Sequence, residues 1–118
     1  LESLGVRVHE VPGGPGGIDL RAALRTLAER EGVATCMLEC GPTLLGAFAD
    51  AGLIDAAVVY IAPTLLADDR ALPSASGRDA PRLSDAQRFT LARVRRCGED
   101  VEITYLAAAP VAAPAARG

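Results

Sequence analysis

The stretch MLECGPTLLGAF, residues 37–48, contains the join that decides the fold. An apolar run ends on Glu39, a Gly-Pro pair follows at positions 41 and 42, and apolar side chains then recur at helical spacing. This pattern is typical of a buried strand that turns directly into a helix. Because proline is favoured at the first helical position, we expect a helix that begins at Pro42 and ends near Gly52.

The segments on either side of this join predict a repeated strand–helix–strand pattern. VRVHEV (6–11) alternates valines with polar residues, as a half-buried strand does. A helix should follow, with Asp19 as its N-cap and Gly32 just past its end. Residues 33–39 should form a strand buried on both faces, and 56–63 a third strand. Two such units predict a parallel sheet with right-handed crossovers.

The second half of the chain predicts different structure. Residues 64–85 indicate a long surface loop with one turn of helix. Two alternating segments then flank Gly98-Glu99-Asp100, which predicts an antiparallel hairpin and therefore a mixed sheet. The Ala/Pro tail, 108–118, has no reason to fold, and PGGPGG (12–17) indicates a flexible connector.

Composition limits the function classes. The formal net charge of the 118 residues is -3, which argues against a nucleic-acid surface. No apolar run is long enough to span a membrane, and the first residues lack the pattern of a signal peptide. Three cysteines form an odd set without a disulfide framework, so we expect a reducing cytoplasm. LESLG resembles the last turn of a helix closed by Gly5, so we expect the domain to be N-terminally truncated.

The start of the second helix has the chemistry of an anion site. A helix N-terminus presents unpaired N–H groups and the positive end of the helix dipole. Gly41 brings no side chain to that corner, Thr43 adds a hydroxyl, and no acidic residue lies in the first turn. Glu39 could accept hydrogen bonds from a ligand. The alternative is an ordinary strand-to-helix join in which Glu39 is a solvated surface group.

Other candidate residues have simpler interpretations. Cys36 and Cys40 are expected to be buried, inert thiols, because a metal site would need two more ligands. His9 is expected to be a polar residue on the open face of an edge strand. The arginines of the first hairpin strand should cover a sheet face or guard an edge, and a subunit contact is the alternative; they are Arg93, Arg95 and Arg96.

Four segments together resemble a known family: LECGPTLLGAF, AGLID, VVYIAPTLL and, at 18–24, IDLRAAL. They are similar to the C-terminal half of the reductase domain of riboflavin-biosynthesis enzymes, the 5-amino-6-(5-phosphoribosylamino)uracil reductases. The resemblance covers residues 1–106, so we expect 1–107 to be the C-terminal part of such a domain. It implies a dihydrofolate-reductase-like α/β fold, with a mixed sheet, flanking helices and a C-terminal antiparallel hairpin.

The resemblance also implies a reaction and a site. NADPH would reduce the ribosylamino group of the substrate to the ribitylamino product. Glu39 would contact the substrate, and a run of seven residues would bind the cofactor: Gly41, Pro42, Thr43, Leu44, Leu45, Gly46 and Ala47. The family's first strands carry most substrate contacts and precede Leu1, so this chain alone would hold an incomplete site. A homodimer and a fused N-terminal deaminase domain are further implications.

Two departures from the family pattern keep alternatives open. Cys40 replaces the first glycine of the family's E-G-G-P-T-L motif, which would be strained if that position needs a positive φ. Residues 67–70 replace a glycine-rich segment. The alternatives are a related pterin or pyrimidine reductase, and a non-catalytic nucleotide-binding or dimerisation module.

Overall fold

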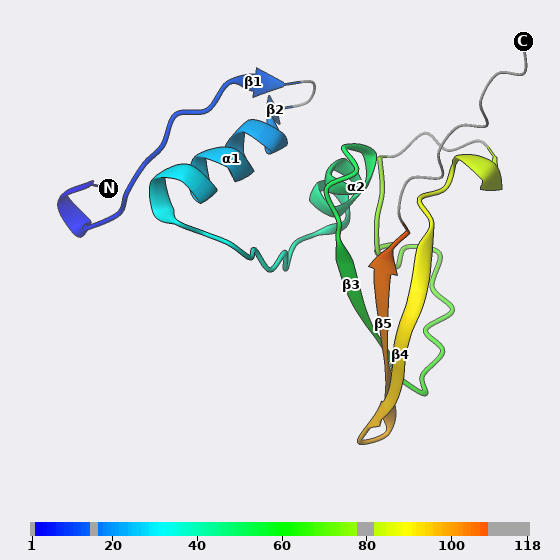
Figure 1. Ribbon diagram of the computed structural model, residues 1–118. Coiled ribbons are helices and arrows are strands. Elements are labelled where there is room, and N and C mark those ends of the chain that lie inside the picture. The colour runs from blue at the N-terminus through cyan, green and yellow to red at the C-terminus, as the bar shows by residue number, and fades with distance from the viewer. Residues whose placement is uncertain (1, 15–16, 78–81, 109–118) are drawn as a thin grey trace, which may run out of the picture.

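The most regular part of the protein is a three-stranded antiparallel sheet (Figure 1). β5 (Asp100–Ala107) is its central strand, and β3 (Ala56–Ile61) and β4 (Phe89–Cys97) pair with its two edges. The structure is a computed structural model that describes residues 2–14, 17–77 and 82–108.

The predicted hairpin and third strand are confirmed. β4 and β5 pair up to Cys97 and Asp100, so a loop of two residues joins them. Its first residue, Gly98, has a φ of 65°, a conformation that favours glycine. A bulge between Leu91 and Arg93 shifts the register of β4 by one residue.

One face of this sheet carries a carboxylate with three partners. Glu102 of β5 is only 2% exposed and lies opposite Tyr60 on one side and Arg95 on the other. Arg95 donates two hydrogen bonds to the carboxylate, at 2.7 and 2.6 Å, and the Tyr60 hydroxyl donates one at 2.8 Å. Arg93, two residues from Arg95 on the same face, donates another at 2.9 Å. Hydrogen bonds from Arg95 and Tyr60 lower the pKa of Glu102 from 4.5 to about 2.

The opposite face of the sheet is apolar and open. Val59, Ile103 and Val94 lie side by side across the three strands, and Val94 is 55% exposed. No hydrophobic residue is buried anywhere in the described parts of the chain. The elements are therefore held by backbone ladders, caps and ion pairs rather than by a hydrophobic core of their own.

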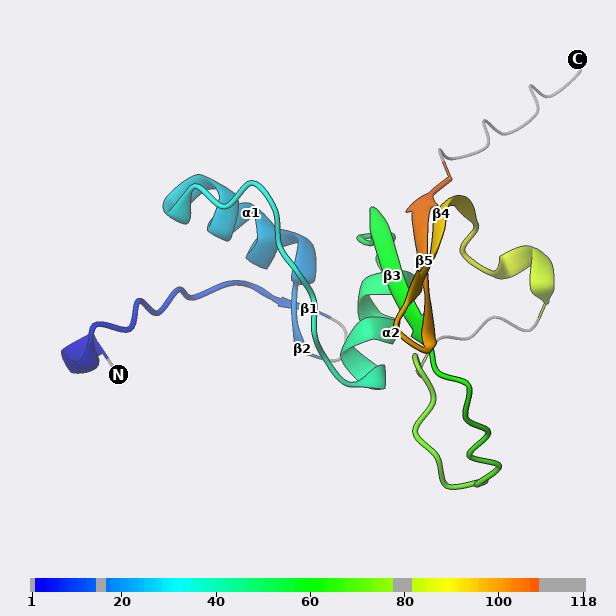
Figure 2. The ribbon, with the colours of Figure 1, turned by 90° about the horizontal axis from the view of Figure 1, so that it is seen from below.

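α1 (Leu20–Glu31) begins and ends where its capping residues predict. The Asp19 carboxylate accepts a hydrogen bond from the Ala22 amide at 3.0 Å, and Gly32 ends the helix in the left-handed conformation with φ of 66°. Both views show α1 apart from the sheet (Figures 1 and 2). The Arg21 guanidinium links it to the second helix by donating to the Ala51 carbonyl at 3.0 Å.

α2 (Pro42–Asp50) confirms the second predicted helix, with Pro42 in its first turn. Gly41 is the N-cap and has an extended backbone, with φ of -71° and ψ of 170°. The extended segment 33–41 joins α2 to α1 (Figure 1), and a turn at Gly52 leads into β3.

Two predicted strands are not strands in the structure. Residues 6–11 and 33–39 are extended but make no ladder with any described segment, so no parallel pair forms among the described residues. Met37 in the second of them is 81% exposed. The prediction was wrong on this point because an apolar, extended sequence becomes a strand only beside a partner strand. Among the described residues before α1, the one strand pairing joins β1 (Gly13–Gly14) to β2 (Gly17–Ile18), at the predicted glycine-rich connector.

The other predictions have mixed outcomes. The one helical turn expected in the long loop is the 3-10 turn Leu83–Asp85, and residues Glu2–Leu4 form another before Gly5, whose φ is 76°. All three cysteines are free and exposed, so the prediction of buried thiols was wrong. The Ala/Pro tail lies outside the described residues except for Ala108. No helix in the described ranges is long and apolar enough to cross a membrane.

The first testable prediction concerns the Glu102 cluster. Replacing Glu102 by Gln should lower the urea midpoint of the full-length protein at neutral pH, because two arginines then lose their anion. The pKa of Glu102 is depressed, so its stabilisation is full above 4.5 and is lost as the pH falls toward 2. The gap between the wild-type and E102Q midpoints should therefore narrow from about pH 5 to about pH 3. Glu99→Gln, at an exposed turn residue, is the matched control, and an E102Q gap no larger than the E99Q gap would contradict the prediction.

The second prediction concerns Ala67, the one described non-glycine residue with a positive φ, of 49°. It lies where the family that the sequence resembles has a glycine-rich segment. The left-handed conformation is unfavourable for alanine, whereas glycine adopts it freely. Ala67→Gly should therefore stabilise the protein by about 0.5 kcal/mol in urea unfolding, although glycine also loses more chain entropy. Ala71→Gly in the same loop should destabilise it instead, and equal effects of the two changes would refute the argument.

Candidate functional site

The site is built around the corner that precedes α2. Pro42 has no N–H, and the first intrahelical bond runs from the Leu45 amide to the Gly41 carbonyl at 3.2 Å. The amides of Thr43 and Leu44 therefore point out of the helix start without an intrahelical acceptor. Among the described residues no side chain caps this end, and the first turn contains no acidic residue. The positive end of the helix is thus free to attract an anion.

Gly41 matters at this corner because it has no side chain, and not because of its backbone conformation. Its φ of -71° is accessible to any residue, so the glycine is not required by the backbone conformation. A Cβ built on Gly41 would meet no atom within 4 Å among the described residues. The importance of the glycine is therefore the space that it leaves in front of the Thr43 and Leu44 amides.

The two residues before Gly41 are also exposed. Cys40 is not among the described residues with a positive φ, so replacing the family's glycine by cysteine creates no left-handed strain here. Glu39 ends the extended segment with an exposed carboxylate. It lies two residues from the open corner and is available to accept hydrogen bonds from a ligand.

The seven residues predicted to bind a cofactor lie on different faces of α2. Leu44 and Ala47 line a groove between α2 and the start of α1, which has a volume of about 710 Å³. Thr43 is exposed at the helix start, and Leu45 is half-buried. Gly46 alone in α2 is buried, and it is not one of the residues that line the groove. The seven residues are contiguous in sequence, but they do not form one surface: Thr43 lies at the open corner, Leu44 and Ala47 lie in the groove, and Gly46 is buried.

The groove brings the glycine-rich connector next to α2. Its walls come from β1, β2, both helices and the residues that cap the helices; they are Gly13, Gly14, Ile18, Asp19, Leu20, Arg21, Leu44, Ala47, Asp50 and Ala51. The connector therefore has a structural neighbour that its sequence did not indicate. It lies beside the helix whose start forms the candidate anion site.

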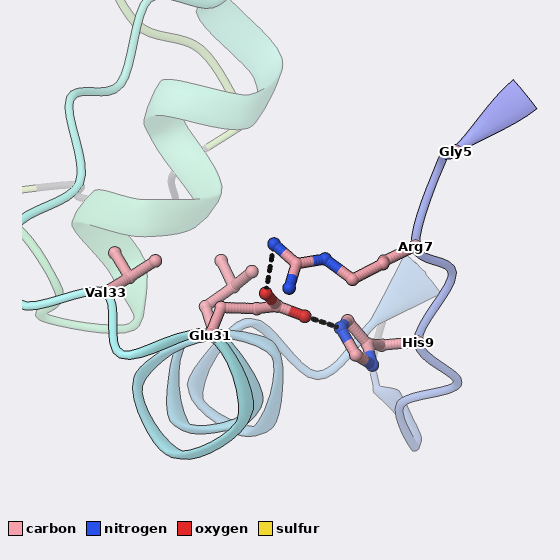
Figure 3. Close-up of a pocket in the computed structure, with 6 residues that line it drawn as sticks. Gly5, Arg7, His9, Glu31 and Val33 are labelled. Carbon is pink, nitrogen blue, oxygen red and sulfur yellow. Dashed lines mark hydrogen bonds and ion pairs between the residues drawn. The ribbon is translucent and has the colours of Figure 1, made fainter.

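Three charged or titratable side chains, Arg7, His9 and Glu31, form a cluster that was not predicted from the sequence (Figure 3). The Glu31 carboxylate, 11% exposed at the end of α1, lies 2.6 Å from His9 Nε2 through one oxygen and 2.6 Å from an Arg7 guanidinium nitrogen through the other. His9 is therefore a partner of Glu31 rather than a polar residue on an edge strand. The bonds hold the extended N-terminal segment against the helix end. His9 and Glu31 are 22 positions apart in the sequence, and no local pattern signals that they meet.

The arginines of β4 resolve into two roles. Arg93 and Arg95 bind Glu102 across the sheet, whereas Arg96 donates to the Gly98 carbonyl at 2.8 Å and supports the hairpin turn. Within the described ranges, no three His, Cys, Asp or Glu residues are grouped as metal ligands would be.

Comparison with known proteins shows the family. Residues 2–103 match the family described as RibD C-terminal domain. The riboflavin biosynthesis protein RibD of Escherichia coli (strain K12) is 38% identical over 97 residues, which are 81% of this chain and 26% of that protein. The Haemophilus influenzae protein of the same name is 33% identical over 90 residues, covering 73% of this chain and 23% of the relative.

Solved structures agree with the shape as well. Two forms of Acinetobacter baumannii RibD superpose with TM-scores of 0.79 and 0.78 at 29% identity. They cover 92% and 91% of this chain, which in turn covers 28% of each of them. The open arrangement is thus that of equivalent segments in larger proteins, and the chain spans about a quarter of the length of its relatives. The chain belongs to the RibD C-terminal domain family.

Proposed function

We propose that this chain supplies the cofactor-facing part of an NADPH-dependent reductase of riboflavin biosynthesis. The reaction would convert the ribosylamino group of 5-amino-6-(5-phosphoribosylamino)uracil to the ribitylamino group. One observation carries the proposal: the open, uncompensated start of α2 lies two residues from the exposed carboxylate of Glu39. Both relatives are named riboflavin biosynthesis proteins, which supports the proposal.

The helix start fits the phosphate groups of such a cofactor. The amides of Thr43 and Leu44 can donate to phosphate oxygens, and the missing side chain at Gly41 allows a close approach. The Thr43 hydroxyl, exposed in the same turn, is a further donor. The apolar Leu44 and Ala47 line the adjoining groove, which offers a surface for the rest of a dinucleotide.

The bound NADPH would supply the hydride, while the protein residues bind and orient both partners. Glu39 is acceptor-only when ionised, so it would bind N–H or O–H groups of the uracil or its sugar. Such a contact would fix the substrate relative to the cofactor, because Glu39 and the helix start at Gly41 belong to one short segment of backbone. No residue of the described chain is assigned a proton-transfer role.

The proposed fold of the complete domain is the dihydrofolate-reductase-like mixed sheet. In it, the extended segments 6–11 and 33–39 would pair with strands from the remaining three quarters of the protein. Most substrate contacts would come from there, so this chain alone would hold an incomplete site. We further propose a cytoplasmic homodimer and, in the whole protein, an N-terminal deaminase domain.

Cofactor oxidation tests the function. The full-length protein should oxidise NADPH when the ribosylaminouracil phosphate is present, as followed by nicotinamide absorbance. Oxidation only with another heterocycle would identify a related pterin or pyrimidine reductase instead. Binding without oxidation of any substrate would identify a non-catalytic nucleotide-binding module. The 118-residue chain alone should bind NADPH weakly in calorimetry, and tight binding would contradict the incomplete-site proposal.

A third prediction uses a charge at the helix start. Thr43→Glu should raise the KM for NADPH by at least about tenfold, because a carboxylate would face the phosphate. The same change should leave the protein as stable or slightly more so, since an acid in the first turn favours the helix. Thr43→Gln, which matches the shape without the charge, should change KM by less than about threefold. Equal effects of the two variants would exclude this helix start as the phosphate site.

A further inference from the structure

Gly46 is enclosed by the backbone of the loop that follows β3. A Cβ built on Gly46 would lie 1.8 Å from the Ser76 carbonyl oxygen and 2.9 Å from the carbonyl carbon. These are backbone atoms, so a larger residue could be accommodated only by moving the loop or the helix. Gly41, five residues earlier, has no such neighbour.

A hydrogen bond places the same loop residue on the first turn of α2. The Ser76 amide donates to the Pro42 carbonyl at 3.0 Å. Pro42 and Gly46 are four residues apart and therefore share one face of the helix. Ser76 thus contacts that face with both its N–H and its C=O, immediately beside Thr43.

The loop has few other attachments. Its described part before residue 78 contains one further backbone hydrogen bond, from Ala71 to the Asp68 carbonyl, and that bond is local. Arg70 likewise pairs locally with Asp68, at 3.4 Å. Among the bonds between described residues, the one from Ser76 to Pro42 is therefore what joins residues 72–77 to the helix.

We propose that Gly46 is a positioning residue that seats residues 72–77 against α2, so that this loop forms one wall of the dinucleotide site at Gly41. This inference rests on the proposed function. The two glycines of the motif then have different tasks: Gly41 leaves room for the ligand, and Gly46 leaves room for the protein's own loop.

The test compares loop protection with NADPH kinetics in the full-length protein. In Gly46→Ala, the Ser76 amide should exchange with solvent about tenfold faster, because its bond to the Pro42 carbonyl is displaced. The KM for NADPH should rise about three- to tenfold, with kcat changed less than about twofold, since the wall affects binding rather than the reacting atoms.

Two variants serve as controls. Ser76→Ala should leave both loop exchange and KM unchanged, because Ser76 makes its described contacts through the backbone. Gly41→Ala should raise KM without changing loop exchange, since its Cβ points into open space. Should Gly46→Ala fail to fold, Ser76→Pro tests the wall through KM alone, because it removes the N–H that bonds Pro42 and leaves α2 intact; its KM for NADPH should rise about three- to tenfold.

The outcomes separate the inference from the proposed function. Unchanged exchange of the Ser76 amide in folded Gly46→Ala overturns the seating role, and an unchanged KM in Ser76→Pro overturns the wall role. Faster exchange with an unchanged KM overturns the wall role. If the wild-type protein oxidises no NADPH with the ribosylaminouracil phosphate, the proposed function fails, while the exchange data still decide whether Gly46 seats the loop.

Discussion

A strand needs a neighbour for its backbone N–H and C=O groups, and the segment 33–39 has none among the described residues. The organisation of the chain follows from this constraint. The segment stays extended, exposes Met37, and leads directly to the corner at Gly41. The two solved RibD structures superpose on more than nine tenths of the chain, so this open arrangement also occurs within larger proteins.

The motif after this segment shows how one short sequence divides its tasks. Pro42 starts the helix and removes one N–H, which leaves the amides of Thr43 and Leu44 as the free donors. Gly41 and Gly46 both lack a side chain, but the atoms around them differ: open space at the first, the Ser76 backbone at the second. The motif therefore combines an open corner at Gly41 with a close backbone contact at Gly46.

The sequence predicted those features that are determined locally. Asp19, Gly32 and Gly98 act within a few residues of themselves, so the limits of α1 and the hairpin turn followed from residue types alone. The open helix start at Gly41 was likewise predictable. The prediction of strands at 6–11 and 33–39 was wrong, because strand formation depends on a partner strand that the local sequence cannot supply. The contact between Gly46 and Ser76 joins residues 30 positions apart, and no periodicity signals it.

The two carboxylate clusters explain how a chain without a buried hydrophobic side chain in its described parts keeps a defined local geometry. Glu31 joins the N-terminal segment to α1 through Arg7 and His9, and Glu102 joins all three strands of the sheet through Arg95 and Tyr60. Charge-assisted bonds depend strongly on direction, so they specify which segments meet even where little apolar surface is buried. Hydrophobic packing, by contrast, would have to come from surfaces that this chain leaves open, such as the Val59–Ile103–Val94 face. Polar contacts therefore specify how these helices and strands meet, and the Val59–Ile103–Val94 face remains available for packing within the larger domain.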